Sequence, residues 1–309
     1  MGLEACIHDG WLLLRNLKGV DPLFLYYTFL NDRAHLAGQG NGSIFINLKT
    51  EIVKRHRILV PPILEQEAIA EVLGALDDKI AANTKLMATS AELAMALFEK
   101  SLSGLSEERA LVDVTTLLSR GITPSYTEDL AGSVIILNQK CVRNQRVDTG
   151  QGRRTLQQKV REEKVLMAED VLVNSTGQGT LGRVARWLGG KVVTVDSHIT
   201  IVRFDPAKVE PTCGGFALMA LQPEIEAMGE GSTGQTELSR VELGKLLVGL
   251  PSHESSLTLG KQLRAMTEME SANDAENRTL AETRDALLPQ LMSGKLRVRD
   301  AETAVEAVV

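Results

Sequence analysis

The chain has 309 residues, of which 43% are hydrophobic and 24% are charged, and its formal net charge at pH 7 is −6. These proportions are ordinary for a soluble globular protein, and the acidic balance argues against a protein that simply coats nucleic acid. At roughly 100–200 residues per domain, the length predicts two domains.

Cysteine usage and hydropathy exclude several further classes of protein. Cys6, Cys141 and Cys213 lie far apart and lack Cys-x-x-Cys spacing, so we expect neither a disulfide framework nor a zinc site. The apolar runs are shorter than the roughly 18–20 residues of a membrane helix. The first residues do not show the basic start and apolar run of a signal peptide. We therefore expect a cytoplasmic protein without a metal centre.

The chain repeats itself with an offset of 190 residues. Residues 59–104 match residues 249–294 without a gap, and at the same offset His8 falls on His198. Residues 106–190 have no counterpart in the first copy. The sequence therefore predicts one full unit and one unit that lacks its N-terminal part.

Two segments carry a long helical pattern, residues 61–105 and 251–298, and each begins at a proline, which cannot continue a helix backwards. Spacings of three and four residues predict a helix-pairing seam, formed by Leu73, Leu76, Ile80, Asn83 and Leu97 in the first helix and by Leu263, Asn273, Leu280 and Leu287 in the second. The aligned asparagines Asn83 and Asn273 either fix the register of the pairing or are tolerated polar positions near solvent.

Between these helices, branched and alternating apolar residues predict β-strands within 133–139, 170–175 and 191–204. The strands alternate with turn residues rather than with a second long helical pattern. We therefore expect a mixed domain with a mainly β core between the two helices.

Residues 177–182 read GQGTLG and match the G-x-G-x-x-G pattern of dinucleotide-binding loops. Such a loop opens a helix, but the following RVARWLGGKVVTV predicts a strand, a tight Gly-Gly turn and a second strand in a hairpin. We therefore expect no nucleotide cofactor. Two interpretations remain open: a polar loop whose glycines admit a large ligand, and a turn without a ligand.

The segment 140–191 holds eleven basic and five acidic residues, although the whole chain is acidic. A basic excess beside a polar loop is typical of nucleic-acid contacts, and a solvated surface of mixed charge is the alternative. The candidates for base contact lie in two loops and are Asn174, Ser175, Gln178, Thr180 and Arg183, then Ser232, Thr233 and Gln235. The phosphate candidates are Lys140, Arg143, Arg146, Arg153 and Arg154.

The sequence offers little for catalysis. Asp196, Ser197 and His198 supply the letters of a catalytic triad, but adjacent residues of a strand point to opposite faces. We find no paired-carboxylate or metal-ligand pattern in the sequence. We therefore expect no catalytic residue, and a dinucleotide-dependent or hydrolytic enzyme is the least favoured alternative.

Four stretches together carry a family resemblance. They are VPPILEQEAIAEVLGALDDKIAANTKL at 60–86, RGITPSYTEDLAGSVIIL at 120–137, AEDVLVNSTGQGTLGRVA at 168–185 and GSTGQTELSRVELGKLLVGLP at 231–251. In this order, and with the internal repeat, they resemble the DNA-specificity (S) subunit of type I restriction–modification systems.

The resemblance implies a non-catalytic subunit that binds double-stranded DNA. In that family two target recognition domains each read half of a bipartite DNA site, and two long helices pack antiparallel as a spacer. Methylation and cleavage belong to methyltransferase (M) and restriction (R) partner subunits. S-adenosylmethionine, ATP and magnesium are therefore expected on those partners, and no cofactor is expected on this chain.

The resemblance also implies the architecture, an α+β fold with mixed α/β recognition domains of mainly β core, linked by two long antiparallel coiled-coil helices. The expected parts are the C-terminal part of a first recognition domain at 1–60, a conserved helix at 61–105, a complete recognition domain at 106–250, a second conserved helix at 251–298 and a tail at 299–309.

The sequence departs from the family pattern in two respects. The first recognition domain lacks its N-terminal part, and Glu65 and Gln66 of the first helix align with Ser255 and Ser256 of the second. Two functions therefore stay open. One is the reading of a DNA half-site, and the other is a coiled-coil scaffold or half-specificity subunit that binds M subunits, a second copy or a separate N-terminal fragment.

Overall fold

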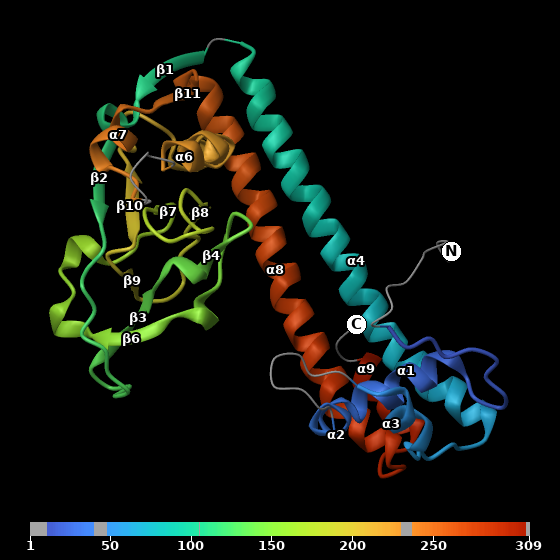
Figure 1. Ribbon diagram of the computed structural model, residues 1–309. Helices are drawn as coiled ribbons and strands as arrows, with labels where there is room; N and C mark the ends of the chain where they lie inside the picture. The colour runs from blue at the N-terminus through green and yellow to red at the C-terminus, as the bar shows by residue number, and fades with distance from the viewer. Residues whose placement is uncertain (1–10, 40–47, 105, 230–236, 307–309) are drawn as a thin grey trace. The chain divides into compact units, whose positions relative to one another are not determined.

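The computed structural model describes residues 11–39, 48–104, 106–229 and 237–306 (Figure 1). Its contacts divide the chain into two units. The helical unit comprises Met1–Ala88 and Met269–Val309, and the sheet unit comprises Thr89–Glu268. Two helices, α4 (Ile63–Leu102) and α8 (His253–Met292), contribute one part to each unit.

The helical unit contains four shorter helices beside its parts of α4 and α8. They are α1 (Pro22–Asn31), α2 (Arg33–Gly38), α3 (Thr50–Arg55) and α9 (Val298–Glu306). The start of α1 is capped because Asp21 Oδ1 accepts hydrogen bonds from the backbone nitrogens of Leu23 and Phe24, at 2.9 and 2.8 Å. Phe24 and Tyr27 of α1 then pack into the apolar core of this unit.

Within the helical unit the two long helices run antiparallel. Asn83 Nδ2 donates to Asn277 Oδ1 at 3.0 Å and to Glu276 Oε2 at 2.7 Å. Six residues earlier in α4, Asp77 accepts from Arg284 Nη1 at 2.6 Å, so the partner numbers rise as the α4 numbers fall. The predicted seam residues Leu73, Leu76, Leu280 and Leu287 share one buried core, and Ile80 packs against it.

The two aligned asparagines differ in their surroundings. Asn83 is buried and bonded across the helix pair, whereas Asn273 Nδ2 is a buried donor without a hydrogen-bond partner among the described residues. Because the helices are antiparallel, the residue four positions after Asn83 lies level with the residue four positions before Asn277. Met87 therefore lies level with Asn273. A thioether is only a weak acceptor, so this position contributes less to the pairing than Asn83.

The sheet unit is built on a four-stranded and a three-stranded sheet. The first has the order β2 (Thr115–Arg120), β10 (Ile199–Phe204), β7 (Val171–Asn174) and β8 (Val184–Arg186), and each neighbouring pair is antiparallel. The second has the order β6 (Arg153–Leu156), β3 (Ser133–Leu137) and β9 (Val193–Val195), with β3 antiparallel to β6 and parallel to β9.

Shorter elements complete the sheet unit. Two strand pairs are β1 (Ser106–Ala110) with β11 (Leu247–Pro251), and β4 (Val142–Arg143) with β5 (Arg146–Val147). The helices are α5 (Pro211–Ala220), α6 (Gln222–Met228) and α7 (Arg240–Lys245). The 3-10 turns are η1 (Leu111–Val114), η2 (Gln139–Cys141), η3 (Thr149–Gln151), η4 (Gln157–Lys159) and η5 (Glu162–Lys164).

The core of the sheet unit lies on both faces of the four-stranded sheet. Ile199, Ile201 and Val202 of the inner strand β10 are fully buried, as expected for a continuous apolar run that has neighbours on both sides. Alternate residues of β7 divide between two clusters, with Val171 and Val173 in one and Leu172 in the other. The sheet is therefore a rigid platform for the loops at its ends.

The predicted fold class, a mixed α+β fold with long helices, is confirmed. The long helix α4 begins directly after Pro62, and α8 begins two residues after Pro251. Both lie within the predicted limits 61–105 and 251–298. Each bound of α8 lies 190 residues after that of α4, and α7 follows α3 at the same offset.

Two expectations from the sequence were wrong. The strand after the glycine loop is present as β8, but it forms no hairpin with β9, because β8 pairs with β7 and β9 pairs with β3. The Gly-Gly turn, with φ of 92° and 103°, instead carries the chain from one sheet to the other. The expected tail 299–309 also contains most of α9, because Ala301 and Val305 are buried in the helical core.

Candidate functional site

Loops from three strands meet at one end of the four-stranded sheet. In the antiparallel register Arg120 at the end of β2 lies opposite Thr200, and Asn174 at the end of β7 lies opposite Ile199. The chain segments 175–183 and 196–198 therefore emerge side by side. We call the region formed by Arg120 and these two segments the loop end.

Three of the predicted base-contact residues hold the loop together from inside. Asn174 is fully buried, and its Nδ2 donates to the carbonyl oxygens of Gln139 at 2.9 Å and Thr180 at 3.0 Å. Ser175 is also buried, with its Oγ 2.5 Å from Thr200 Oγ1. Thr180 Oγ1 donates to the Gly177 carbonyl at 3.2 Å. These side chains shape the loop rather than extend from its surface.

The outer surface of the loop end is polar and basic. Gln178 is exposed, and Arg183 is partly exposed with its Nη2 donating to the Gly179 carbonyl at 2.7 Å. Thr176 Oγ1 lies 2.6 Å from Nδ1 of the exposed His198. Amide, guanidinium and imidazole groups therefore reach solvent together from neighbouring loops.

The glycines of this loop serve the protein's own packing more than ligand clearance. Gly177, Gly179 and Gly182 have φ of 106°, 72° and 81°, a region that favours glycine. A Cβ at Gly182 would lie 2.5 Å from Glu226 Cα, so α6 occupies that space. Only Gly179 faces open space. The expected close approach of a ligand is therefore limited to the tip of the loop.

The phosphate candidates lie in three places, namely η2, the β4–β5 turn and β6. Lys140 lies in η2, directly after Gln139, whose side-chain nitrogen would be 3.1 Å from a Cβ at Gly177. Lys140 therefore lies beside the glycine loop, and it is exposed. Arg143 and Arg146 face each other across the β4–β5 turn and are both exposed.

Arg153 and Arg154 lie on β6 of the other sheet. Arg153 Cζ stacks 3.4 Å from the centroid of the Tyr126 ring. Arg154 Nε donates to Ser133 Oγ at 2.8 Å and its Nη2 donates to the Ser133 carbonyl at 2.9 Å. Both line a pocket of about 530 Å³. Arg154 is therefore mainly structural, whereas the Arg153 guanidinium is exposed on an aromatic ring.

The structure adds a residue that the sequence did not indicate. Arg120 Nη1 pairs with Glu237 Oε1 at 2.8 Å, and its Nη2 donates to the Leu238 carbonyl at 3.0 Å. The backbone of Glu237 also forms an antiparallel β-bridge with that of Thr176. This places the start of the described segment 237–238 at the loop end. The predicted contacts Ser232, Thr233 and Gln235 lie outside the described residues. No sequence pattern marks Arg120, because its partners are distant in the chain.

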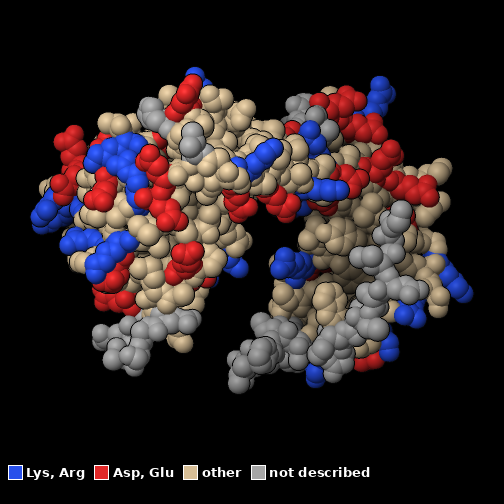
Figure 2. Space-filling view, turned by 90° about the horizontal axis from the view of Figure 1, so that it is seen from above, with Lys and Arg blue, Asp and Glu red and all other residues tan. Residues whose placement is uncertain are grey.

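Part of the basic excess is buried. Lys164 is 8% exposed and its Nζ donates to the Arg120 carbonyl at 2.8 Å. Burial lowers the pKa of the Lys164 ammonium. Burial also raises the pKa of the Asp196 carboxyl, while the His198 backbone nitrogen, which donates to Asp196 Oδ1, lowers it. On the face shown in Figure 2, Lys and Arg lie beside Asp and Glu, so the charge of that face is mixed.

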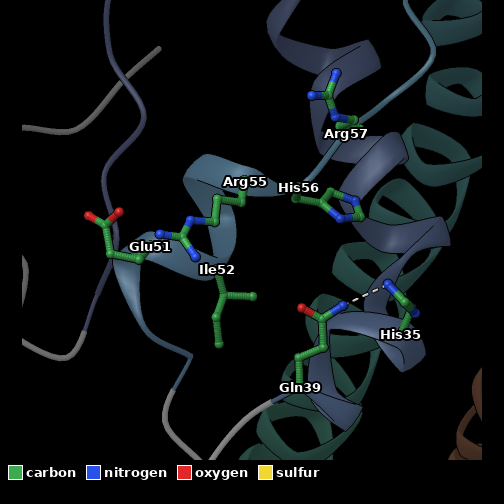
Figure 3. A pocket seen from close by; sticks show the side chains of 7 residues that line it. All are labelled: His35, Gln39, Glu51, Ile52, Arg55, His56 and Arg57. Atoms are coloured by element: carbon green, nitrogen blue, oxygen red, sulfur yellow. Dashed lines mark hydrogen bonds between the residues drawn. The ribbon is translucent and has the colours of Figure 1, made fainter.

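The helical unit has a pocket of its own, of about 490 Å³, between α2 and the segment from α3 to Arg57 (Figure 3). His35 Nε2 lies 2.7 Å from Gln39 Nε2, and Glu51 pairs with Lys54 at 3.0 Å. His56 Nε2 is 2.7 Å from Asp32 Oδ2. Most polar groups of this pocket are therefore engaged within the unit, and none of the predicted DNA contacts lines it.

Neither a metal centre nor a membrane span is found in the described part of the chain. No group of three or more His, Cys, Asp or Glu side chains there could hold a metal ion. None of its helices combines the length and the apolar character needed to cross a membrane.

Residues 8–89 match the family described as type I restriction modification DNA specificity domain. The matched segment is similar to a type I DNA specificity domain, and it makes up less than half of the chain. The resemblance seen in the sequence is thus confirmed, and the match covers α4 as far as residue 89 and the segment before this helix. No curated protein shows a significant match to the chain.

Solved structures agree with this family at the level of fold. The chain is similar to the type I restriction–modification S subunit from M. genitalium, with a TM-score of 0.61 and 17% identity, over 88% of this chain and 73% of that one. It is more distantly similar to the HsdS subunit from Thermoanaerobacter tengcongensis, with a TM-score of 0.40 and 17% identity over 90% and 71% of the two chains. A structure on type I complex assembly matches at a TM-score of 0.44 and 16% identity over 90% and 72%.

Proposed function

We propose that the chain is a non-catalytic specificity subunit of a type I restriction–modification complex, and that its sheet unit reads one DNA half-site through the loop end. The observation that carries this proposal is the convergence of Gln178, Arg183, His198 and Lys140 on the loops at one end of a buried sheet. The loops that carry these side chains are fixed to the strands, because Asn174 donates to the carbonyls of Gln139 and Thr180 and Ser175 contacts Thr200 of β10. Base recognition requires side chains whose spacing is fixed in this way.

The chemistry of these side chains divides the work of recognition. The amide of Gln178 can donate and accept together, which matches the edge of adenine in the major groove. The cations of Arg183 and Lys140 suit phosphates, and Arg183 can alternatively reach the edge of guanine. Arg143 and Arg146 would extend the phosphate contacts along the β4–β5 turn.

Selection from random double-stranded DNA tests the proposal, with the chain alone and with the M subunit of the same host. We expect one short half-site motif, with an affinity that falls steeply as salt rises. Gln178→Ala should relax one base position of that motif. The matched control is Lys208→Ala, since Lys208 follows β10 at the opposite end of the same sheet. A pool that yields no motif in both conditions would contradict DNA reading by this chain.

The long helices are the proposed contact with M subunits, and through them with R subunits. Leu86 and Leu93 of α4 are large apolar residues that are 47% and 49% exposed. The two leucines lie seven residues apart and so share one side of the helix, where they offer an apolar contact to a protein partner. Leu86→Ser combined with Leu93→Ser should weaken co-purification with M, whereas Ala82→Ser, on an exposed position of the same helix, should not.

These exposed positions also favour the second candidate function, a scaffold that binds M subunits without reading DNA. The two candidates differ in one measurement, because a scaffold co-purifies with M but yields no DNA motif. S-adenosylmethionine, ATP and magnesium are proposed to bind the partners. Titration calorimetry of the chain alone with S-adenosylmethionine should accordingly give no binding heat.

A further inference from the structure

His198 occupies the turn that joins the end of β9 at Val195 to the start of β10 at Ile199, and so it connects the two main sheets. Asp196 Oδ1 accepts a hydrogen bond from the His198 backbone nitrogen at 2.9 Å. The His198 carbonyl accepts one from the Ser175 nitrogen at 2.8 Å. The backbone that carries the ring is therefore fixed on both sides.

Among the described residues, only one nitrogen of the imidazole has a hydrogen-bond partner. Nδ1 lies 2.6 Å from Thr176 Oγ1, and the residue is exposed. Within the described residues Nε2 has no hydrogen-bond partner. A hydroxyl can donate or accept, so Thr176 suits both the neutral and the protonated ring. In the protonated ring Nδ1–H donates to Thr176, and Nε2–H points a charged donor away from it.

The charged groups on the neighbouring elements favour an anion at this place. Asp196 lies on the same turn. Arg120 on β2 pairs with Glu237, which forms a β-bridge with Thr176. Arg183 lies on the glycine loop, and Lys140 lies on η2 next to Cys141. Glu237 is neutralised by Arg120, and Asp196 is buried. Arg183, which is partly exposed, and Lys140, which is exposed, remain on these elements, and both are positively charged.

We propose that His198, held by Thr176, is an anchoring residue that donates from Nε2 to a DNA phosphate and binds it most tightly when the ring is protonated. The inference rests on the proposed DNA-binding function. It adds a residue that neither charge nor base-reading chemistry had marked in the sequence. The repeat supports it, because His8 stands at the equivalent position of the first copy, while the adjacent Ser197 is replaced by Ile7.

The test is the binding of a labelled duplex by the full chain between pH 5.5 and 8.5 at constant ionic strength. Because only the protonated ring carries a charge, we expect the affinity of the wild type to fall roughly three- to tenfold between pH 6 and 8. His198→Gln keeps a neutral donor and should flatten this dependence. The loss should be the same for all DNA sequences, and the salt slope should fall by about 1.

Calorimetry in two buffers of different ionisation enthalpy gives an independent readout. Near pH 7 the wild type should take up part of a proton on binding DNA, and His198→Gln should take up less. His35→Gln, at an exposed histidine of the helical unit, is the matched control and should behave like the wild type. Fluorescence of the buried Trp187 verifies that each variant is folded.

Three outcomes overturn the inference, and they differ in whether they also contradict the proposed DNA-binding function. If the wild type binds DNA and His198→Gln has the same affinity and pH dependence, His198 is no anchor but the proposed function stands. If His198→Gln changes the preference at one base position, the residue reads a base edge instead of a phosphate. If the wild type binds no duplex at any pH, the inference and the proposed function fail together.

Discussion

Arg183 and Arg186 lie three residues apart in the sequence, and both count toward the basic excess of residues 140–191. Arg183, at the loop end, is partly exposed, and its guanidinium donates to the carbonyl of Gly179 at 2.7 Å. Arg186, on β8, is 5% exposed, and its guanidinium donates to Glu169 Oε2 at 2.7 and 3.1 Å. One arginine is therefore available to a ligand, and the other is part of the core.

The two arginines differ because Arg186 lies on the buried strand β8 and Arg183 does not. Residues of β8 are buried, so a cation there must be paired, and Glu169 supplies the charge. Arg186 Nη1 also donates to Thr267 at 3.2 Å, and its Cζ lies 4.9 Å from the centroid of the Phe216 ring. Arg183 precedes the strand and escapes these constraints. A count of basic residues in a sequence thus overstates the charge that is available to a ligand.

The largest expected effect is on Arg186. Arg186→Met leaves the Glu169 carboxylate poorly solvated and without its partner, so the free energy of unfolding of the sheet unit should fall by about 3–5 kcal/mol. Urea unfolding followed by Trp187 fluorescence measures it. The double variant Arg186→Met with Glu169→Gln should recover part of the loss, because it removes the unpaired charge. Equal loss in both variants would show that packing against Phe216, not the ion pair, dominates.

A smaller loss of stability is expected at Arg154. Its guanidinium donates to Ser133 Oγ and to the Ser133 carbonyl, so Arg154→Ala should cost about 1–3 kcal/mol in the same unfolding measurement. The neighbouring Arg153→Ala removes only an exposed contact with Tyr126 and should cost less than about 1 kcal/mol. If the two variants are equally stable, Arg154 does not have a structural role distinct from that of Arg153.

Arg183→Ala should reverse the pattern seen at Arg186, with stability changed by less than about 0.5 kcal/mol and DNA affinity reduced. If Arg183 meets a phosphate, the affinity for all sequences should fall alike, and the salt slope should fall by about 1. If it reads a base edge, one position should relax by about 1–3 kcal/mol. Lys208→Ala is the control for both readouts. Unchanged affinity would remove Arg183 from the interface.

The smallest effect concerns pH and the buried Lys164. Because burial lowers the pKa of this ammonium, the unfolded chain binds more protons between the lowered value and the ordinary value of about 10.4. Stability contributed by Lys164 should therefore rise with pH through that window, and Lys164→Met should lack the rise. Unfolding midpoints of both proteins across alkaline pH measure the difference.

The buried Cys141 changes stability with pH in the direction opposite to Lys164, so the experiment requires a control. Burial raises the pKa of its thiol, so the unfolded chain loses the proton first and stability falls above about pH 8.5. The comparison for Lys164 should therefore be made in a Cys141→Ala background. A wild-type curve parallel to that of Lys164→Met in this background would show that Lys164 stays charged through the window.

Sequence reasoning recovered the two long helices and the strands β3, β7, β8, β9 and β10 because their signals are local. The prolines before Ile63 and His253 cannot continue a helix backwards, and the seam spacing of Leu73, Leu76 and Leu280 identifies the buried face of each long helix. The glycine loop was correctly separated from a dinucleotide fold, because the residues after Gly182 form β8 and not a helix. Pairing partners such as β3 for β9 carry no local signal and were missed.

The candidate site was only partly accessible to the same reasoning. Residue types at 174–183 indicated a polar loop, but burial sorted them, with Asn174 and Ser175 inside and Gln178 outside. His198 had been considered only as a triad member. Its contact with Thr176 spans 22 residues, a distance over which no sequence pattern pairs a hydroxyl with a ring nitrogen.

The sequence by itself determined the family resemblance, the two long helices, the repeat and the local excess of basic residues, since each depends on composition or on spacing along the chain. The tertiary structure alone decided which basic groups face solvent, because burial and pairing depend on residues distant in sequence, such as Glu169 for Arg186 and Ser133 for Arg154. It also brought Arg120, Thr176 and His198 to one end of the sheet, through the antiparallel register of β2, β10 and β7.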